Sequence, residues 1–182
     1  MAHTTAAQLT AAMDGIRQSP KDNGTIELIQ RRPDTDLREV IEQAELDTSL
    51  GMIGDNWKLK GSRKTADGSA HPEMQINLMN SRVITAIAGD RNNWLPAGDQ
   101  FFVDLDLSDK NLPPGTQLEL GNALFEITDI PHLGCKKFSA RFGRDATLFV
   151  NSEEGKSLNL RGINAKVIRA GSVSTGDRIK KL

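Results

Sequence analysis

The sequence predicts a mainly β fold: a β-barrel of mixed or antiparallel strands with a few short helices attached. Short apolar segments follow one another at roughly even spacing, with turns rich in glycine or proline between them. Two of these segments are joined only by Gly121-Asn122, a connection typical of a β-hairpin. In residues 101–107 apolar residues occupy every second position, as they do in a strand with one buried face.

The first 22 residues predict a helical extension, which could either pack on the barrel or be mobile. Leu9, Met13 and Ile16 recur at helical spacing in an alanine-rich segment. We therefore expect two parts, an N-terminal extension over residues 1–22 and one domain over residues 23–182.

The strands expected in this domain are apolar segments bounded by turn residues. They are residues 25–30, 74–79, 101–107, 116–120, 123–130, 165–169 and 178–181. Asn80 or Ser81 can cap a short helix that Gly89 ends. Residues 58–72 are polar and predict a long loop, whereas residues 40–50 fit either a strand or a helix.

Cys135 is the only cysteine and the best candidate for the functional centre. Residues 135–151 have helical spacing, Gly143 divides them, and Asp145 can cap the second piece. Cys135 then lies at a helix start, where the helix dipole and the cations that follow in the sequence lower a thiol pKa. A thiolate is what metal ligation and sulfur transfer both require, but a lone cysteine can equally be a small buried residue without chemistry.

Other polar residues offer weaker candidates. His132 lies three residues before Cys135 and could share a metal or a proton with it, or be an ordinary loop histidine. A solvated surface charge is the commoner role for any single arginine, but Arg161, which precedes Gly162 and interrupts an apolar segment, is the more suggestive candidate for an anion site. Asp55 and Asp99 each follow a glycine and are interpreted as turn residues.

Net charge and cysteine content indicate which partners and which cellular compartment to expect. The chain has 182 residues and a net charge of −1, so no overall field attracts it to nucleic acid or to an anionic membrane. A single cysteine fits a reducing compartment, and residues 1–19 lack the pattern of a signal peptide. We expect a cytoplasmic protein that binds neither nucleic acid nor membranes.

An ordered series of motifs resembles a bacterial group of MOSC domains, named after the C-terminal domain of molybdenum-cofactor sulfurase. The resemblance runs from about Gly24 to the C-terminus. Its motifs are residues 32–33, 51–55, 98–100, 104–108, 131–138, 141–146, 149–151, 160–163 and 176–179. Where small relatives often carry Gly-Asp-x-His-His-Gly and Gly-Glu-Asn-Leu, this chain has Gly54-Asp55-Asn56-Trp57 and Gly98-Asp99-Gln100-Phe101.

The resemblance implies a β-rich barrel, a bound molybdenum cofactor and a role for the family's cysteine, which matches Cys135. Cys135 would be the metal ligand and, with His132, the catalytic pair. The residues that would hold the pterin phosphate are Lys136, Arg141, Asn151 and Arg161. Molybdenum-ion binding and pyridoxal-phosphate binding are the activities that the resemblance associates with the fold.

Three functions follow and stay open at this point. The first is binding of the molybdenum cofactor, with reduction of N-hydroxylated compounds by electrons from a separate electron-transfer protein. The second is sulfur carriage, in which Cys135 receives sulfur from a cysteine desulfurase and passes it to a sulfur acceptor. The third is a non-catalytic binding module that retains only the barrel.

Overall fold

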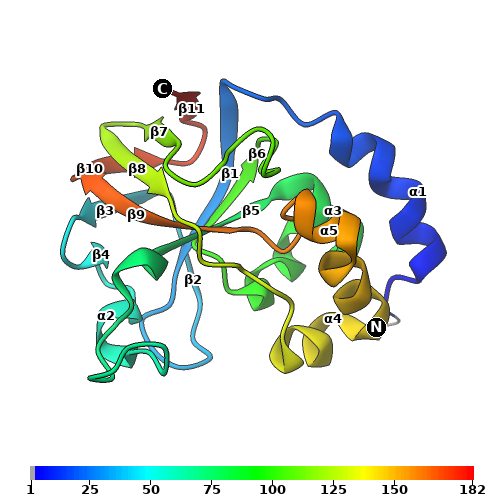
Figure 1. Ribbon diagram of the computed structural model, residues 1–182, viewed down its shortest axis with the longest axis horizontal. Coiled ribbons are helices and arrows are strands. Elements are labelled where there is room, and N and C mark those ends of the chain that lie inside the picture. Colours follow the sequence, from blue (N-terminus) through cyan, green and yellow to red (C-terminus); the bar gives the residue numbers. More distant parts are fainter. Residues whose placement is uncertain (1–2) are drawn as a thin grey trace.

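The computed structural model describes residues 3–182, and its centre is a closed barrel of seven strands with most of the helices gathered on one side (Figure 1). The strands are β1 (Gly24–Arg31), β2 (Glu39–Ile41), β3 (Gln43–Asp47), β4 (Gly51–Met52), β5 (Ile76–Asn80), β6 (Phe101–Asp104), β7 (Gln117–Leu120), β8 (Ala123–Ile127), β9 (Ile163–Arg169), β10 (Gly171–Ser174) and β11 (Arg178–Lys181). The helices are α1 (Ala6–Arg17), α2 (Trp57–Lys60), α3 (Ser81–Ala88), α4 (Lys136–Asn151) and α5 (Glu153–Ser157), with 3₁₀ turns at Pro72–Met74, Arg91–Asn93 and Leu95–Ala97.

The barrel strands follow the order β11-β7-β8-β9-β5-β6-β1, and β1 pairs again with β11 to close the ring. All of these pairs are antiparallel except β5 with β6, whose connection carries α3 and two 3₁₀ turns. A parallel pair requires such a crossover, because its strands must begin at the same end. The mainly β barrel with a few helices that the sequence predicts is therefore confirmed, including the hairpin of β7 and β8 at Gly121-Asn122.

Strand β6 separates the two apolar cores. Phe101 and Val103 point into the barrel, whereas Phe102 packs on the outside, under the helices. This outer core explains why Phe102 interrupts the alternation in the sequence: both faces of β6 are buried here. On the helix side the carboxylate of Asp104 pairs with Arg82 at 2.8 Å.

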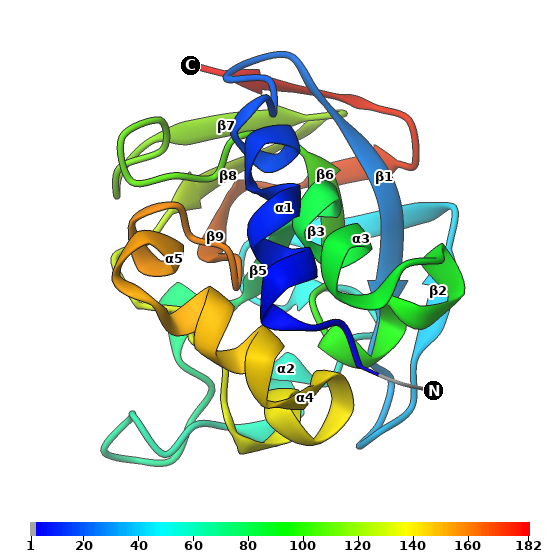
Figure 2. The same cartoon turned by 90° about the vertical axis from the view of Figure 1, so that its right-hand side faces the viewer.

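Helix α1 packs onto α3 and α4 through Leu9, Met13 and Ile16 (Figure 2). Its first turn receives an additional partner, because the Ala6 N–H donates to the carboxylate of Asp145 at 3.0 Å. Asp145 therefore supplements the Thr5 cap of α1, whereas the sequence suggests that it caps the second half of α4. This contact joins residues that are far apart in the sequence, which is why the local pattern does not show it.

Two segments differ from the sequence-based expectation. Residues 58–72 are not one uninterrupted loop, since they begin inside α2 and end at a 3₁₀ turn. The ambiguous residues 40–50 form the end of β2 and strand β3, which pairs with β10 in a small second sheet. Within the described residues, none of the helices combines the length and apolar character needed to cross a membrane.

Candidate functional site

Cys135 stands at the N-cap of α4, at the end of a loop that leads from β8 over the barrel. Its backbone is extended (φ −108°, ψ 178°), its side chain is exposed, and the Ser139 N–H donates to its carbonyl oxygen at 3.0 Å. The predicted position of Cys135 at the start of a helix is confirmed.

Gly143 breaks α4 into two short pieces that turn toward each other. Its backbone (φ 89°, ψ 170°) lies in a region that favours glycine, and the sequence predicts the division. Because of this turn the last residue of α4 returns to the loop before the first. The Asn151 side chain accepts a hydrogen bond from the Gly134 N–H at 2.9 Å and donates one to the Gly134 carbonyl at 2.8 Å.

Asn151 thus holds the turn that carries Cys135, and it is not among the residues that line the pocket beside the thiol. Replacing Asn151 by alanine is expected to lower the free energy of unfolding by about 1–3 kcal/mol, because it leaves two backbone groups of Gly134 without their partners. Denaturant titration measures this loss. Asn92→Ala, at an exposed position, is the control and should change stability by less than about 0.5 kcal/mol. An equal effect of both substitutions would show that the Gly134 contacts contribute nothing.

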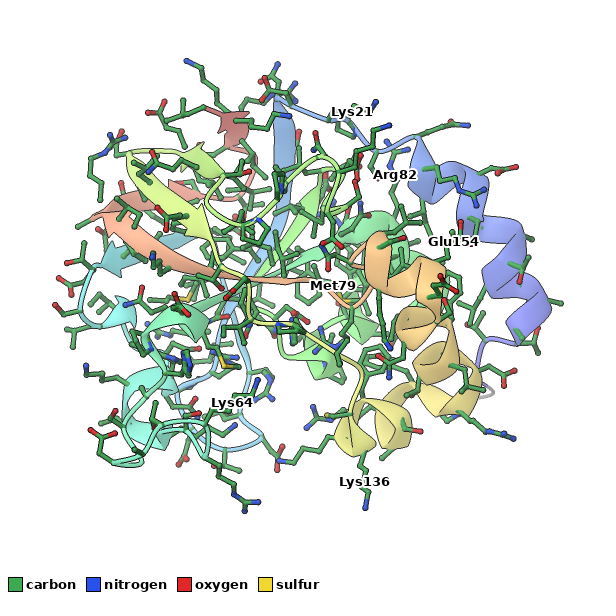
Figure 3. All side chains as sticks on the ribbon, viewed as in Figure 1. Lys21, Lys64, Met79, Arg82, Lys136 and Glu154 are labelled. Carbon is green, nitrogen blue, oxygen red and sulfur yellow. The ribbon has the colours of Figure 1, made fainter. Side chains whose placement is uncertain are left out.

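A pocket of about 170 Å³ opens beside Cys135, and we call it the basic pocket. Three residues singled out in the sequence, His132, Arg141 and Arg161, line it together with Cys135. Lys136 does not line it and points away from the body of the protein (Figure 3), whereas its neighbour Lys137 does line it. The cations of the lining are Arg32, Arg38, Lys60, Lys137, Arg141 and Arg161.

Two of these cations are held in place by buried carboxylates. Arg32 binds Asp55 through two nitrogens, at 2.8 and 2.7 Å, and donates to the Gly98 carbonyl at 3.0 Å. Arg161 binds both oxygens of Asp99 through one nitrogen, at 2.9 and 2.8 Å. The side chains of Asp55 and Asp99 are 0% exposed, so both are buried counter-charges as well; Asp55 is also the turn residue that the sequence predicts, since its carboxylate accepts from the Trp57 N–H at 3.0 Å. An aspartate after glycine in an otherwise apolar context is the signal that could have indicated a buried partner.

Of the remaining cations, Arg141 pairs with the exposed Asp36 at 3.0 Å and donates to the Pro96 carbonyl at 2.8 Å, whereas Arg38 and Lys60 are crowded by like charges. Burial, followed by the positive charges of Arg141 and Arg32, lowers the pKa of Arg38. Burial and the charges of Arg32, Lys137 and Arg38 likewise lower the pKa of Lys60. The carboxylates in the lining itself are those of Asp34 and Asp36, fewer than its cations. The basic pocket therefore favours an anion, which would relieve this repulsion.

The thiol of Cys135 titrates below its ordinary range. Partial burial, the largest influence, raises its pKa, but the N–H groups of Phe138 and Lys137 and the charge of Arg161 together outweigh burial and leave the pKa lowered. The thiolate form is therefore favoured at the helix start, as the sequence suggests.

Alkylation by iodoacetamide tests this directly. Only the thiolate reacts, so the rate rises with pH through the thiol pKa. We expect the midpoint of this rise to lie at a lower pH in the folded protein than in a short peptide that contains Cys135 and its neighbours. Equal midpoints, or a higher one in the protein, would contradict the lowered pKa.

His132 forms the inner wall of the basic pocket. Burial, followed by the charges of Arg161, Arg32 and Lys64, lowers its pKa well below the ordinary 6.5. The imidazole is therefore neutral at pH 7. Its Nδ1 lies 3.5 Å from the Asp99 carboxylate and has no hydrogen-bond partner among the residues that the structure describes.

Metal ligands from the protein are few. In residues 3–182 no three His, Cys, Asp or Glu side chains gather in the way that a metal ion would need.

No family model and no curated protein matches the sequence. Solved structures do match the fold. The YuaD protein of Bacillus subtilis is 17% identical, with a TM-score of 0.61 over 87% of this chain and 95% of that chain. YiiM from Escherichia coli is 18% identical, with a TM-score of 0.55 over 87% of this chain and 69% of that one. YiiM from Geobacillus stearothermophilus is 13% identical, with a TM-score of 0.60 over 87% and 75% of the two chains. Likeness at these identities is a likeness of fold, and the fold that this chain shares with them is the MOSC-type β-barrel.

Proposed function

We propose that the protein binds the molybdenum cofactor in the basic pocket, with the Cys135 thiolate as a ligand of the metal. The observation that carries the proposal is the excess of cations around one exposed thiol of lowered pKa. A phosphate group suits the cations, and a soft thiolate suits molybdenum.

The residues present fit such a group. Nε of Arg38 is a buried donor without a hydrogen-bond partner in the described part of the chain, so an anionic ligand in the basic pocket could satisfy it. A second hollow of about 210 Å³ adjoins the basic pocket and shares Arg32, Asn56, Lys60, Asn77 and His132 with it. Together they reach the lower end of the range of about 300–1,000 Å³ that is usual for small-molecule sites.

Each residue has a distinct part in this proposal. Arg32 and Arg161 are fixed by their buried carboxylates before any ligand arrives, so little freedom is lost on binding. Arg141 and Lys137 are more exposed and would close on the phosphate from the side of α4. The neutral ring of His132 can exchange a hydrogen bond with the ligand or its substrate without adding charge. When bound, the cofactor would supply the redox chemistry, which we propose is reduction of N-hydroxylated compounds with electrons from a separate protein.

Metal analysis tests the ligand role. Wild type and Cys135→Ala are purified without oxygen from cells that make the cofactor, and their molybdenum content is compared. We expect the substitution to remove most of the metal while thermal unfolding shows the same fold. Equal molybdenum in both proteins, or none in the wild type, would sink the proposal.

Calorimetric titration with inorganic pyrophosphate tests the anion site separately. Loss of one charged hydrogen-bond donor should weaken binding about tenfold, so Arg141→Gln is expected to bind less tightly than wild type. Arg144→Gln is the matched control, because Arg144 lies on the same helix, is exposed and does not line the pocket. Equal affinities in the two variants would mean that Arg141 holds no phosphate.

Sulfur carriage is the second candidate, and the exposure of Cys135 favours it. The thiolate would attack the persulfide of a cysteine desulfurase, take its outer sulfur atom and leave the desulfurase cysteine as a thiolate. Incubation with a desulfurase and free cysteine should then add the mass of one sulfur atom to the wild type and not to Cys135→Ala. An unchanged mass would remove this candidate.

A further inference from the structure

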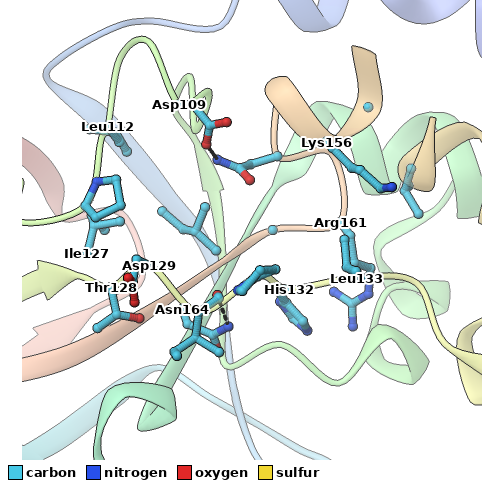
Figure 4. Close-up of a pocket in the computed structure, with 18 residues that line it drawn as sticks. Asp109, Leu112, Ile127, Thr128, Asp129, His132, Leu133, Lys156, Arg161 and Asn164 are labelled. Atoms are coloured by element: carbon cyan, nitrogen blue, oxygen red, sulfur yellow. Dashed lines mark hydrogen bonds between the residues drawn. The ribbon is translucent and has the colours of Figure 1, made fainter. Parts of the chain in front are cut away.

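Another pocket adjoins the basic pocket, and Figure 4 shows the side chains that line it. Its volume is about 380 Å³, within the range of about 300–1,000 Å³ that is usual for small-molecule sites. The end of β8, the loop before Cys135, the start of β9, α5 and residues 109–114 all contribute to it. Only His132 and Arg161 line both pockets, so these two side chains form the partition.

The lining of this pocket is largely apolar, whereas the lining of the basic pocket is rich in cations. Its apolar side chains come from separate elements: Leu112, Ile127, Ile130, Leu133, Val150 and Ile163. We therefore call it the apolar pocket. Among the described residues, its lysine and arginine side chains are Lys156 and the shared Arg161.

Three polar side chains of the apolar pocket are already engaged within the protein, whereas Asp129 and Lys156 are exposed residues of its lining. Asn164 donates to the Ile130 carbonyl at 2.8 Å, and Thr128 donates to the Glu73 carbonyl at 2.7 Å. Asn159 donates to Asp109 at 2.8 Å. A ligand that needs many hydrogen bonds would find few free partners here. A charged ligand would lose its hydration shell without gaining enough hydrogen bonds to offset that cost.

The partition is the exception. Nδ1 of His132 and Nε of Arg161 are buried polar atoms without a hydrogen-bond partner in residues 3–182. Buried polar atoms of this kind are rare in folded proteins and call for a partner. Figure 4 shows the two side chains next to each other at one end of the pocket, whereas Asp129 and Lys156 lie on opposite sides of it.

We infer that the apolar pocket binds a small uncharged organic molecule with an apolar body and one hydrogen-bond acceptor, such as a carbonyl oxygen, directed at the partition. The apolar side chains would cover the body of the ligand, and Nε of Arg161 would donate to its acceptor. Binding at this site requires neither an anion in the basic pocket nor a metal at Cys135. It also gives the protein two ligand sites that share one wall, so occupancy of one can influence the other.

Fluorescence of N-phenyl-1-naphthylamine, an uncharged apolar dye, tests the inference. We expect a saturable rise of fluorescence with wild type. Leu133→Asp should weaken dye binding about tenfold or more, because it places a charge in the apolar lining. Leu148→Asp is the matched control: Leu133 is 46% and Leu148 57% exposed, and only Leu133 lines the pocket. Absence of a saturable rise, or equal weakening in both variants, would overturn the inference.

Competition on the wild type tests it without any variant. Acetophenone, which has an apolar ring and one carbonyl, is expected to displace the dye, and inorganic pyrophosphate is not. Displacement by pyrophosphate and not by acetophenone would place the dye in the basic pocket and overturn the inference. The outcome does not depend on molybdenum, so failure of the dye experiments leaves the proposed function unaffected. Failure of the molybdenum analysis likewise leaves the inference about the apolar pocket unaffected.

Discussion

Replacing Asp99 by asparagine is expected to lower the free energy of unfolding by about 3–5 kcal/mol, the usual cost of breaking a buried ion pair from one side. The Asp99 carboxylate is fully buried and both of its oxygens accept from Arg161. The substitution keeps the shape of the side chain but leaves the Arg161 guanidinium buried without its counter-charge. Urea unfolding at pH 7 measures the loss, which is large beside a total stability of about 5–15 kcal/mol.

Two comparisons make this result specific. Asp14→Asn removes the exposed partner of Arg17 and should change stability by less than about 1 kcal/mol. The double substitution Asp99→Asn with Arg161→Gln removes both charges and should recover part of the loss. If Asp99→Asn lowers the free energy of unfolding no more than Asp14→Asn does, the buried ion pair contributes no more to stability than the exposed one, and the prediction is wrong.

The second large effect is a pH dependence of stability that His132 controls. Its pKa is well below 6.5 in the folded protein, because of burial and the nearby charges of Arg161, Arg32 and Lys64. In the unfolded chain the imidazole regains its ordinary pKa and takes up a proton first. Stability is therefore present above the unfolded pKa and is lost as the pH falls below it, by up to about 1.4 kcal/mol for each pH unit.

Urea unfolding at about pH 7.5 and about pH 5.5 checks this sign. We expect wild type to lose more stability between the two than His132→Gln, which cannot take up the proton. His3→Gln, at an exposed position, should keep the wild-type loss. Burial raises the pKa of Asp99, which faces His132, and this acts in the opposite direction. The difference between wild type and His132→Gln isolates the histidine, and no difference would show that its pKa is not lowered.

Much of the candidate site follows from one continuous segment of the sequence. Residues 131–138 place Cys135 at a helix start and His132 beside it, because turn residues and helix caps act over a few residues. The helix break at Gly143 follows from the same kind of local signal.

The other half of the basic pocket comes from distant loops. Arg32 lies at the end of β1, Arg38 in the next loop, and Lys60 at the end of α2. No spacing in the sequence relates these cations to Cys135. The sequence likewise could not show that Asn151 binds the Gly134 turn and does not line the pocket, because this depends on how far α4 turns back.

By itself the sequence determined the barrel strands, the β7–β8 hairpin and the position of Cys135, since alternation, turns and caps act on the backbone over short distances. The tertiary structure alone decided which charges are buried, which cations converge and where two pockets share a wall. The environment of Asp99, Arg161 and His132 is set by the elements that pack around them, and that packing determines their charge state and the ligands they can accept.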